Sequence, residues 1–228
     1  MKFVRALAAL AALTVGATAN ATLLIDGFGD TNVGGTADDM TPVIMYSDLV
    51  TDTDIAGVVN RTITTESLNG GDVTSDVDSF GGNPNTFFQH SQDVLTLGTS
   101  LIEWDFAPNA GPLGAPITIS VEVISADLPG ATISFSLFDG VDTLTESLVL
   151  PAVNGGAQNF TFTFFDAMDV LDENNIVGAS LFIDGSMVEA LDVAIDFVAV
   201  PMPEPSALAL VGLGLFGLSF AARRRRAA

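Results

Sequence analysis

The sequence predicts an all-β domain, a two-sheet β-sandwich of the jelly-roll type. Apolar and polar residues alternate along several short segments, which is typical of strands that bury one face. Turn-forming residues such as Asp139-Gly140 and Asn154-Gly155-Gly156 separate these segments. About ten short strands punctuated in this way favour two packed sheets.

The strands are expected where the alternation is cleanest. It is unbroken in four segments, Ile117–Val123, Ile133–Leu137, Phe160–Phe164 and Leu191–Phe197. Further strands are expected at Val43–Tyr46, Arg61–Thr65, Val94–Leu97, Leu101–Phe106, Leu144–Leu150 and Val177–Ile183. The stretches Asp26–Pro42 and Ser67–Asn85 are rich in Gly, Asp, Asn and Ser, so we expect long surface loops there.

The start of the chain is expected to be a secretory signal peptide. A basic segment, Met1–Arg5, precedes an apolar run, Ala6–Val15, and small residues follow. Cleavage can follow Ala19 or Ala21. The second position is favoured, because Thr22-Leu23-Leu24-Ile25 then opens the next domain as a strand. The apolar run is too short to remain as a membrane anchor.

The end of the chain combines three features in a fixed order. Pro203-Glu204-Pro205 precedes an uncharged run from Ala207 to Ala222, and Arg223-Arg224-Arg225-Arg226 closes it. As a helix the run spans roughly 24 Å, and thinning of the ~30 Å hydrocarbon core or snorkelling arginines can cover the difference. The arginines are costly to translocate, so they are expected to stay cytoplasmic as a membrane stop. A buried helix of a soluble domain is the alternative.

This order of motif, apolar run and arginine cluster resembles the tail of PEP-CTERM proteins, a bacterial family with a signal peptide and a C-terminal sorting tail. The resemblance implies that a membrane-embedded exosortase recognises Pro203-Glu204-Pro205 and cleaves at or near it. Membrane insertion would then be transient, and the domain would end outside the cell or on its outer surface. Such proteins are typical of Gram-negative bacteria that make exopolysaccharide. The resemblance covers the tail alone and implies no activity.

The composition between the two ends is strongly acidic. All 28 acidic residues except Glu204 lie between Thr22 and Met202, whereas Arg61 is the one basic residue there, so this part carries a net charge of −26. Such a field repels nucleic acid and anionic membranes and attracts cations. The chain has no cysteine, which excludes disulfides and thiol chemistry. We therefore expect a signal peptide (1–21), an acidic sandwich (22–200) and a sorting tail (201–228).

Few residues point to catalysis. His90 is the one histidine, and no Gly-x-Ser-x-Gly motif accompanies it, so we expect it on the surface or on an edge strand. No cysteine or histidine cluster suits zinc, and a domain with 27 acids will contain carboxylate pairs by chance. Trp104 alternates in phase with Ile102 and Phe106, which favours a place in the core over a sugar-binding platform.

Calcium is the cofactor that the acidic loops could bind, because it takes six to eight oxygen ligands. The weak candidate ligands are Asp166, Asp169, Asp172, Glu173, Asp139 and Asp142. None of these groups matches an EF-hand loop. The favoured alternative is that these acids are solvated turn residues, and the 166–175 group could also be one short helix.

Three functions remain open from the sequence. The first is a non-enzymatic, exported protein of the cell envelope or extracellular matrix. The second is a calcium-stabilised carbohydrate-binding module for exopolysaccharide. The third, a secreted hydrolase, has the least support, and no catalysis is expected.

Overall fold

The computed structural model describes residues 22–29, 33–79, 86–111, 113, 116–165 and 170–201. Within this part, Leu23–Val200 form one compact unit. The predicted signal peptide with Ala19 and Ala21, the sorting motif and the arginine cluster lie outside the described residues. Across the described ranges, no helix combines the length and apolar character that crossing a membrane requires.

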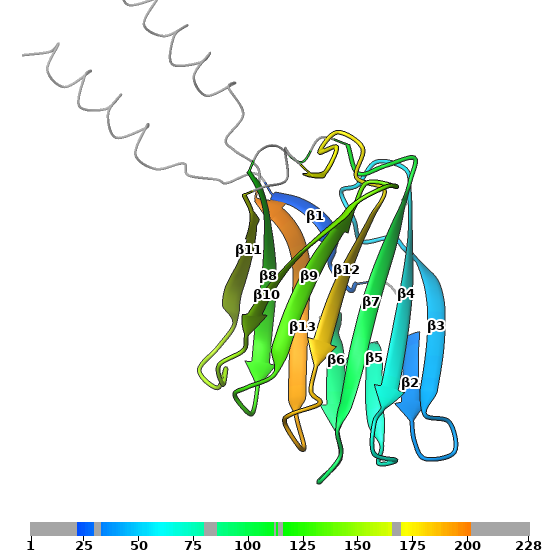
Figure 1. Ribbon diagram of the computed structural model, residues 1–228, viewed down its shortest axis with the longest axis vertical. Coiled ribbons are helices and arrows are strands. Elements are labelled where there is room, and N and C mark those ends of the chain that lie inside the picture. The colour runs from blue at the N-terminus through cyan, green and yellow to red at the C-terminus, as the bar shows by residue number, and fades with distance from the viewer. Residues whose placement is uncertain are drawn as a thin grey trace, which may run out of the picture. The chain divides into compact units, whose positions relative to one another are not determined.

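Thirteen strands form two antiparallel sheets that pack face to face (Figure 1). The first sheet has the order β11-β8-β13-β6-β5-β2, and β1 pairs with β13 beside it. Its strands are β1 Thr22–Asp26, β2 Val33–Ala37, β5 Val73–Ser79, β6 Thr86–Gln92, β8 Ile117–Ala126, β11 Gln158–Phe164 and β13 Asp192–Pro201. The second sheet has the order β10-β9-β12-β7-β4-β3. Its strands are β3 Val43–Val50, β4 Val58–Ser67, β7 Gly98–Ala107, β9 Thr132–Phe138, β10 Thr143–Val149 and β12 Gly178–Asp184. The prediction of an all-β two-sheet sandwich is confirmed.

The alternation in the sequence is what makes each sheet two-sided. In β8, Ile117, Ile119, Val121 and Val123 are buried, while the residues between them are partly exposed. Burying each such side chain contributes about 1.5–3 kcal/mol, so a strand with this pattern is stable only with one face covered. The second sheet supplies that cover.

An aromatic group occupies the middle of the core. Trp104 of β7 stacks on Phe135 of β9, with ring centroids 6.1 Å apart, and Phe162 and Phe164 of β11 pack on Phe135 from the opposite sheet. Trp104 is 1% exposed, which confirms its predicted place in the core. It is therefore not available as a sugar platform.

Three local predictions are wrong. The stretches Asp26–Pro42 and Ser67–Asn85 are not only loops, because β2 and β5 lie within them and pair with each other. β6, which follows, is not among the strand segments predicted from alternation. Val94–Leu97 is a turn instead of a strand, and Val94 is 80% exposed although it is apolar.

The first and last strands of the unit are neighbours. β1 pairs with β13, and Figure 1 shows the start of β1 and the end of β13 at the same end of the sandwich. Since β13 also pairs with β8 and β6, it is an interior strand.

Candidate functional site

A shallow groove lies on the outer face of the first sheet, over β6, β13 and β8. Its floor is Ala194 of β13, which stands opposite Gln89 of β6 on one side and Ser125 of β8 on the other. A methyl group between two longer side chains leaves a depression of about 170 Å³. The strand register therefore places the short Ala194 side chain between two longer ones.

The groove is bordered by an aromatic ring and a carboxylate. Phe87 and Gln89 alternate with the buried Phe88 and are partly exposed. Asp192, two residues before Ala194, also lines the groove, and its carboxylate accepts a hydrogen bond from the Ser91 hydroxyl. The groove thus combines an apolar ring face with an amide, a hydroxyl and a carboxylate.

Further acidic residues lie next to the groove residues in the strand register or in the adjoining loop. Asp76 of β5 stands opposite Gln89 in the strand register. The Asp127 carboxylate accepts a hydrogen bond of 2.8 Å from the backbone amide of Asp192. Asp196 is the extra residue of a β-bulge in β13, where partial burial raises the pKa of its carboxyl.

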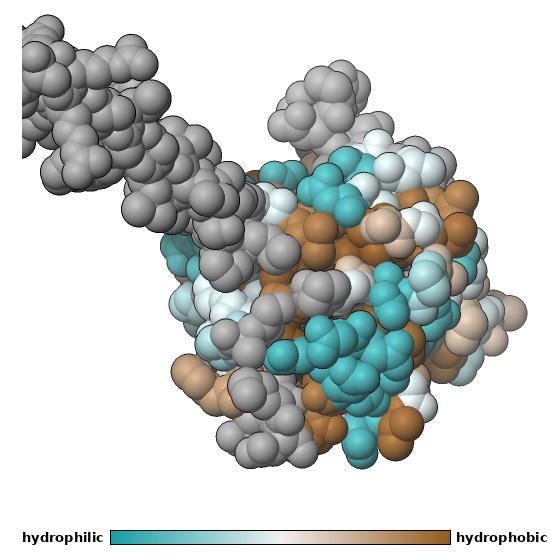
Figure 2. All heavy atoms as spheres, turned by 90° about the horizontal axis from the view of Figure 1, so that it is seen from above, coloured by the Kyte–Doolittle hydropathy of each residue, from teal (hydrophilic) through white to brown (hydrophobic). Residues whose placement is uncertain are grey.

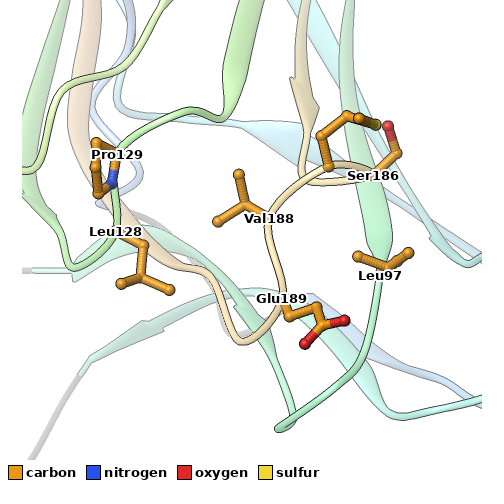
Figure 3. Close-up of a pocket in the computed structure, with 7 residues that line it drawn as sticks. Leu97, Leu128, Pro129, Ser186, Val188 and Glu189 are labelled. Carbon is orange, nitrogen blue, oxygen red and sulfur yellow. The ribbon is translucent and has the colours of Figure 1, made fainter.

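A larger hollow of about 600 Å³ lies among three loops at one end of the sandwich (Figure 3). It is lined by Leu97, Leu128, Pro129, Ser186, Met187, Val188 and Glu189. Most of these side chains are apolar. The hollow has two polar side chains, Ser186 and Glu189, and no aromatic ring on which a sugar could stack.

His90 is not where the sequence led us to expect it. It lies on β6, between β13 and β5, and is 0% exposed, so the prediction of a surface or edge position is wrong. Its inward position follows from Phe88 and Gln92, which are buried on the same face. Alternation does not mark this strand, because two of its three inward residues, His90 and Gln92, are polar.

A neutral hydrogen-bonded group surrounds His90, and we call His90, Ser100, Ser75 and Gln92 the neutral cluster. Gln92 Nε2 donates to the Gly98 carbonyl (3.0 Å) and to His90 Nε2 (2.9 Å), so the His90 proton lies on Nδ1, which faces Ser100 Oγ at 2.5 Å. Ser75 and Ser100 are hydrogen-bonded through their hydroxyls. Burial lowers the pKa of His90 to about 4, so it is uncharged at neutral pH.

The neutral cluster has the serine–histidine pair that a hydrolase would use, but not its surroundings. Ser75, Ser100 and His90 are each 0% exposed, so no substrate in solvent touches them. The far nitrogen of His90 faces an amide, where a catalytic triad places a carboxylate. We interpret the pair as a core hydrogen bond.

Arg61 forms a second buried group, which we call the ionic cluster: Asp26, Arg61, Asp48 and Trp104. Arg61 Nη1 donates to both oxygens of Asp26 (2.9 and 3.1 Å), and Arg61 Nε donates to Asp48 (3.0 Å). Trp104 Nε1 and the Phe28 amide also donate to Asp26, each at 2.8 Å. Burial raises the pKa of Asp26 to about 6, against the lowering effect of these donors.

The predicted calcium ligands that the structure describes lie in two connected segments, the β9–β10 turn and the loop before β12. Asp139, in the β9–β10 turn, accepts hydrogen bonds of 2.8 Å from the amides of Val141, Asp142 and Asp172. These bonds, that from Asp172 first, hold the pKa of Asp139 below its usual value. The structure thus brings Asp139 and Asp172 together, although they are far apart in the sequence, and the Asp139 carboxylate caps backbone amides.

The remaining acidic residues give no complete metal site in the part of the chain described. Asp166 and Asp169 lie outside that part, so the full predicted group stays a prediction. The described residues contain no group of three or more acidic or histidine side chains placed to hold a metal ion. In the loop before β12, Glu173 Oε2 is buried without a hydrogen-bond partner.

Figure 2 looks down on the end of the sandwich seen at the top of Figure 1 and shows hydrophilic residues clustered among hydrophobic ones.

The groove residues were missed by the sequence analysis. Phe87, Gln89, Ser125 and Asp192 come from three strands that are distant in the chain. The one usable signal was Phe87-Phe88, since two adjacent aromatic residues in a strand must face opposite sides. One of them therefore lies outside the core.

Comparison with known proteins identifies the tail. Residues 203–226 match the PEP-CTERM protein-sorting motif, which includes Pro203, Glu204 and Pro205 and extends through Arg223–Arg226. The motif indicates an exported, exosortase-targeted protein, as the residues of the tail predicted. No curated protein matches the chain.

Solved structures resemble the sandwich only loosely. TmCBM61, solved in complex with β-1,4-galactotriose, is 10% identical, with 70% of this chain and 88% of that chain covered and a TM-score of 0.37. The family 11 carbohydrate-binding module of a Clostridium thermocellum cellulosomal cellulase is 10% identical, with 82% and 97% covered and a TM-score of 0.42. These scores are low, so the likeness carries no argument about what this chain binds.

Proposed function

We propose that the exported domain is a non-catalytic module that binds extracellular polysaccharide through the groove over β6, β13 and β8. The composition of the groove is the observation that supports this. A sugar ring has an apolar C–H face and a rim of hydroxyls, and the Phe87 ring beside Gln89 and Asp192 is complementary to both. The shallow shape fits a polymer that lies across the sheet.

The sorting motif supports the place of action. An exported chain that loses its anchor at Pro203-Glu204-Pro205 would be released where exopolysaccharide accumulates. The same route also fits our first expectation, a protein of the extracellular matrix, because a matrix protein must hold a matrix polymer. Bound calcium would then stabilise the folded domain and take no part in a reaction.

The groove gives less support to hydrolysis. Asp192 is the one carboxylate among its lining residues, whereas glycoside hydrolysis uses two that flank the scissile bond. The serine–histidine pair is buried elsewhere. Binding without turnover is the function that this geometry supports best.

Binding to a glycan array tests the proposal, with the processed protein recovered after expression of the full chain. Phe87→Ala and Gln89→Ala should each weaken binding to the preferred glycan by about tenfold, the equivalent of roughly 1.4 kcal/mol. Phe182→Ala is the matched control, because Phe182 is a partly exposed phenylalanine on the outer face of the other sheet. A blank array, or equal loss in all three variants, would count against the groove.

A further inference from the structure

The domain surface lacks side-chain cations. Arg61 and His90 are the only basic or histidine residues between Thr22 and Pro201 in the sequence, and both are 0% exposed. Arg61 is held by Asp26 and Asp48, and His90 is uncharged. No side chain on this surface can therefore pair with a sulfate, phosphate or carboxylate of a ligand.

The outer face of the first sheet carries negatively charged side chains near the groove. Asp192 lines the groove, Asp76 stands opposite Gln89, and Asp127 binds the Asp192 amide. Glu122 of β8 stands opposite Phe197 of β13 on the same face. Asp192 is thus the one carboxylate that lines the groove, and the other three come from two neighbouring strands and the adjoining loop.

From this distribution we propose that the groove selects polysaccharides that bear free amino groups, and rejects uronate, sulfate or phosphate polymers. The inference rests on the proposed function and names its ligand class. A protonated amine on a sugar at Phe87 would lie within reach of the carboxylates around Gln89 and Asp192. The net charge of −26 would raise the local concentration of such a polycation and repel a polyanion.

Three defined probes test the proposal on the processed full-chain product: fully de-N-acetylated glucosamine oligomers, their N-acetylated counterparts, and oligogalacturonate. The de-N-acetylated oligomer should bind most tightly, and its affinity should fall as salt is raised, because screening weakens charge pairing. Oligogalacturonate should not bind in the presence of chelator or of calcium.

Variants separate the groove from the charge of the whole domain. Asp192→Asn should weaken binding of the de-N-acetylated oligomer by about threefold at low salt, a typical effect for one exposed charge. Phe87→Ala should weaken it further. Glu103→Gln removes an exposed acid on the outer face of the other sheet and should have no effect. Equal weakening by Asp192→Asn and Glu103→Gln would overturn the selectivity of the groove.

The outcomes also separate this inference from the proposed function. Equal binding of both glucosamine oligomers at all salt concentrations would overturn the amine preference and leave polysaccharide binding in place. Calcium-dependent binding of oligogalacturonate would overturn it too, since a bridging ion would then replace the missing cation. Binding of none of the three, with a blank array, would reject the proposed function itself.

Discussion

The ionic cluster and the neutral cluster occupy the same core but handle charge in opposite ways. Both include a residue of β7, Trp104 in the ionic cluster and Ser100 in the neutral one, with Ile102 buried between them. Four residues of strand place them about 13 Å apart. The backbone environment is therefore shared, and the difference comes from the side chains.

The difference follows from what each basic group can do with its proton. The Arg61 guanidinium cannot lose its proton, so it is buried with two carboxylates. The His90 imidazole can lose its proton, so it is buried neutral, with one ring nitrogen accepting from Gln92. The ionic cluster is charged at neutral pH and the neutral cluster is not. The stability that each cluster contributes should therefore change with pH in the opposite direction.

The largest effect should come from removing the cation. Arg61→Met leaves Asp26 buried with only the Trp104 and Phe28 donors, and breaking a buried ion pair in this way costs about 3–5 kcal/mol. Urea denaturation at neutral pH measures the loss in the free energy of unfolding. Asn60→Ala, an exposed change on the same strand, should stay within about 0.5 kcal/mol. Similar losses in both variants would mean that the ionic cluster contributes little.

The second effect isolates the neutral cluster. The pKa of His90 falls from 6.5 to about 4 on folding, so the unfolded chain binds its proton more readily, and acidification from pH 6.5 to 4 removes roughly 3 kcal/mol of stability. His90→Phe abolishes this titration. The free energy of unfolding of the variant, relative to wild type, should therefore rise as pH falls through that window. A difference that stays flat would show that His90 does not titrate as its burial requires.

Asp26→Asn should show the opposite sign. The pKa of Asp26 rises from 3.8 to about 6, so its contribution to stability is full below pH 3.8 and is lost as pH rises to 6, again by roughly 3 kcal/mol or somewhat less. The variant lacks this gain on acidification. Relative to wild type it should become less stable as pH falls from 7 to 4, and a relative gain instead would contradict the raised pKa.

The smallest effect on stability should come from Asp139 in the β9–β10 turn, whose carboxylate has no cation among the described residues as its partner. Its carboxylate accepts three backbone hydrogen bonds that Asp139→Ala would remove. The melting temperature should fall by about 4 °C, with or without chelator, because the role is capping. A melting temperature of the wild type that drops with chelator, and an Asp139→Ala variant that no longer responds, would instead support the calcium prediction.

The sequence predicted the sandwich where the inward residues are apolar. Ile117–Val123 and Ile133–Leu137 fall within β8 and β9, because hydrophobic alternation and burial coincide there. β6 was not predicted because two of its inward residues, His90 and Gln92, are polar. Val94–Leu97 was wrongly predicted as a strand because its apolar residues suggested burial, and apolar residues can also be exposed. The alternation of apolar and polar residues predicts burial only where the buried residues are apolar. It therefore does not reveal a buried cluster of polar residues.

The sites were less predictable than the fold. The tail could be identified because its three signals are contiguous in the chain. The groove could not, since Ala194, Gln89 and Ser125 meet only through the strand order β8-β13-β6. The acidic turns could be found as a composition, but the capping by Asp139 depends on a contact with Asp172 that the sequence does not encode locally.

The position of β13 has a consequence for the fate of the protein after export. The strand ends at Pro201, and the sorting motif begins at Pro203. A cut within the motif would leave almost no backbone beyond a strand that is paired within the sheet and carries the buried Val198 and Val200. Exopeptidases and unfolding proteases need a loose end to grip, so the trimmed domain would offer them none at this terminus. The processing step would then also set how long the protein survives outside the cell.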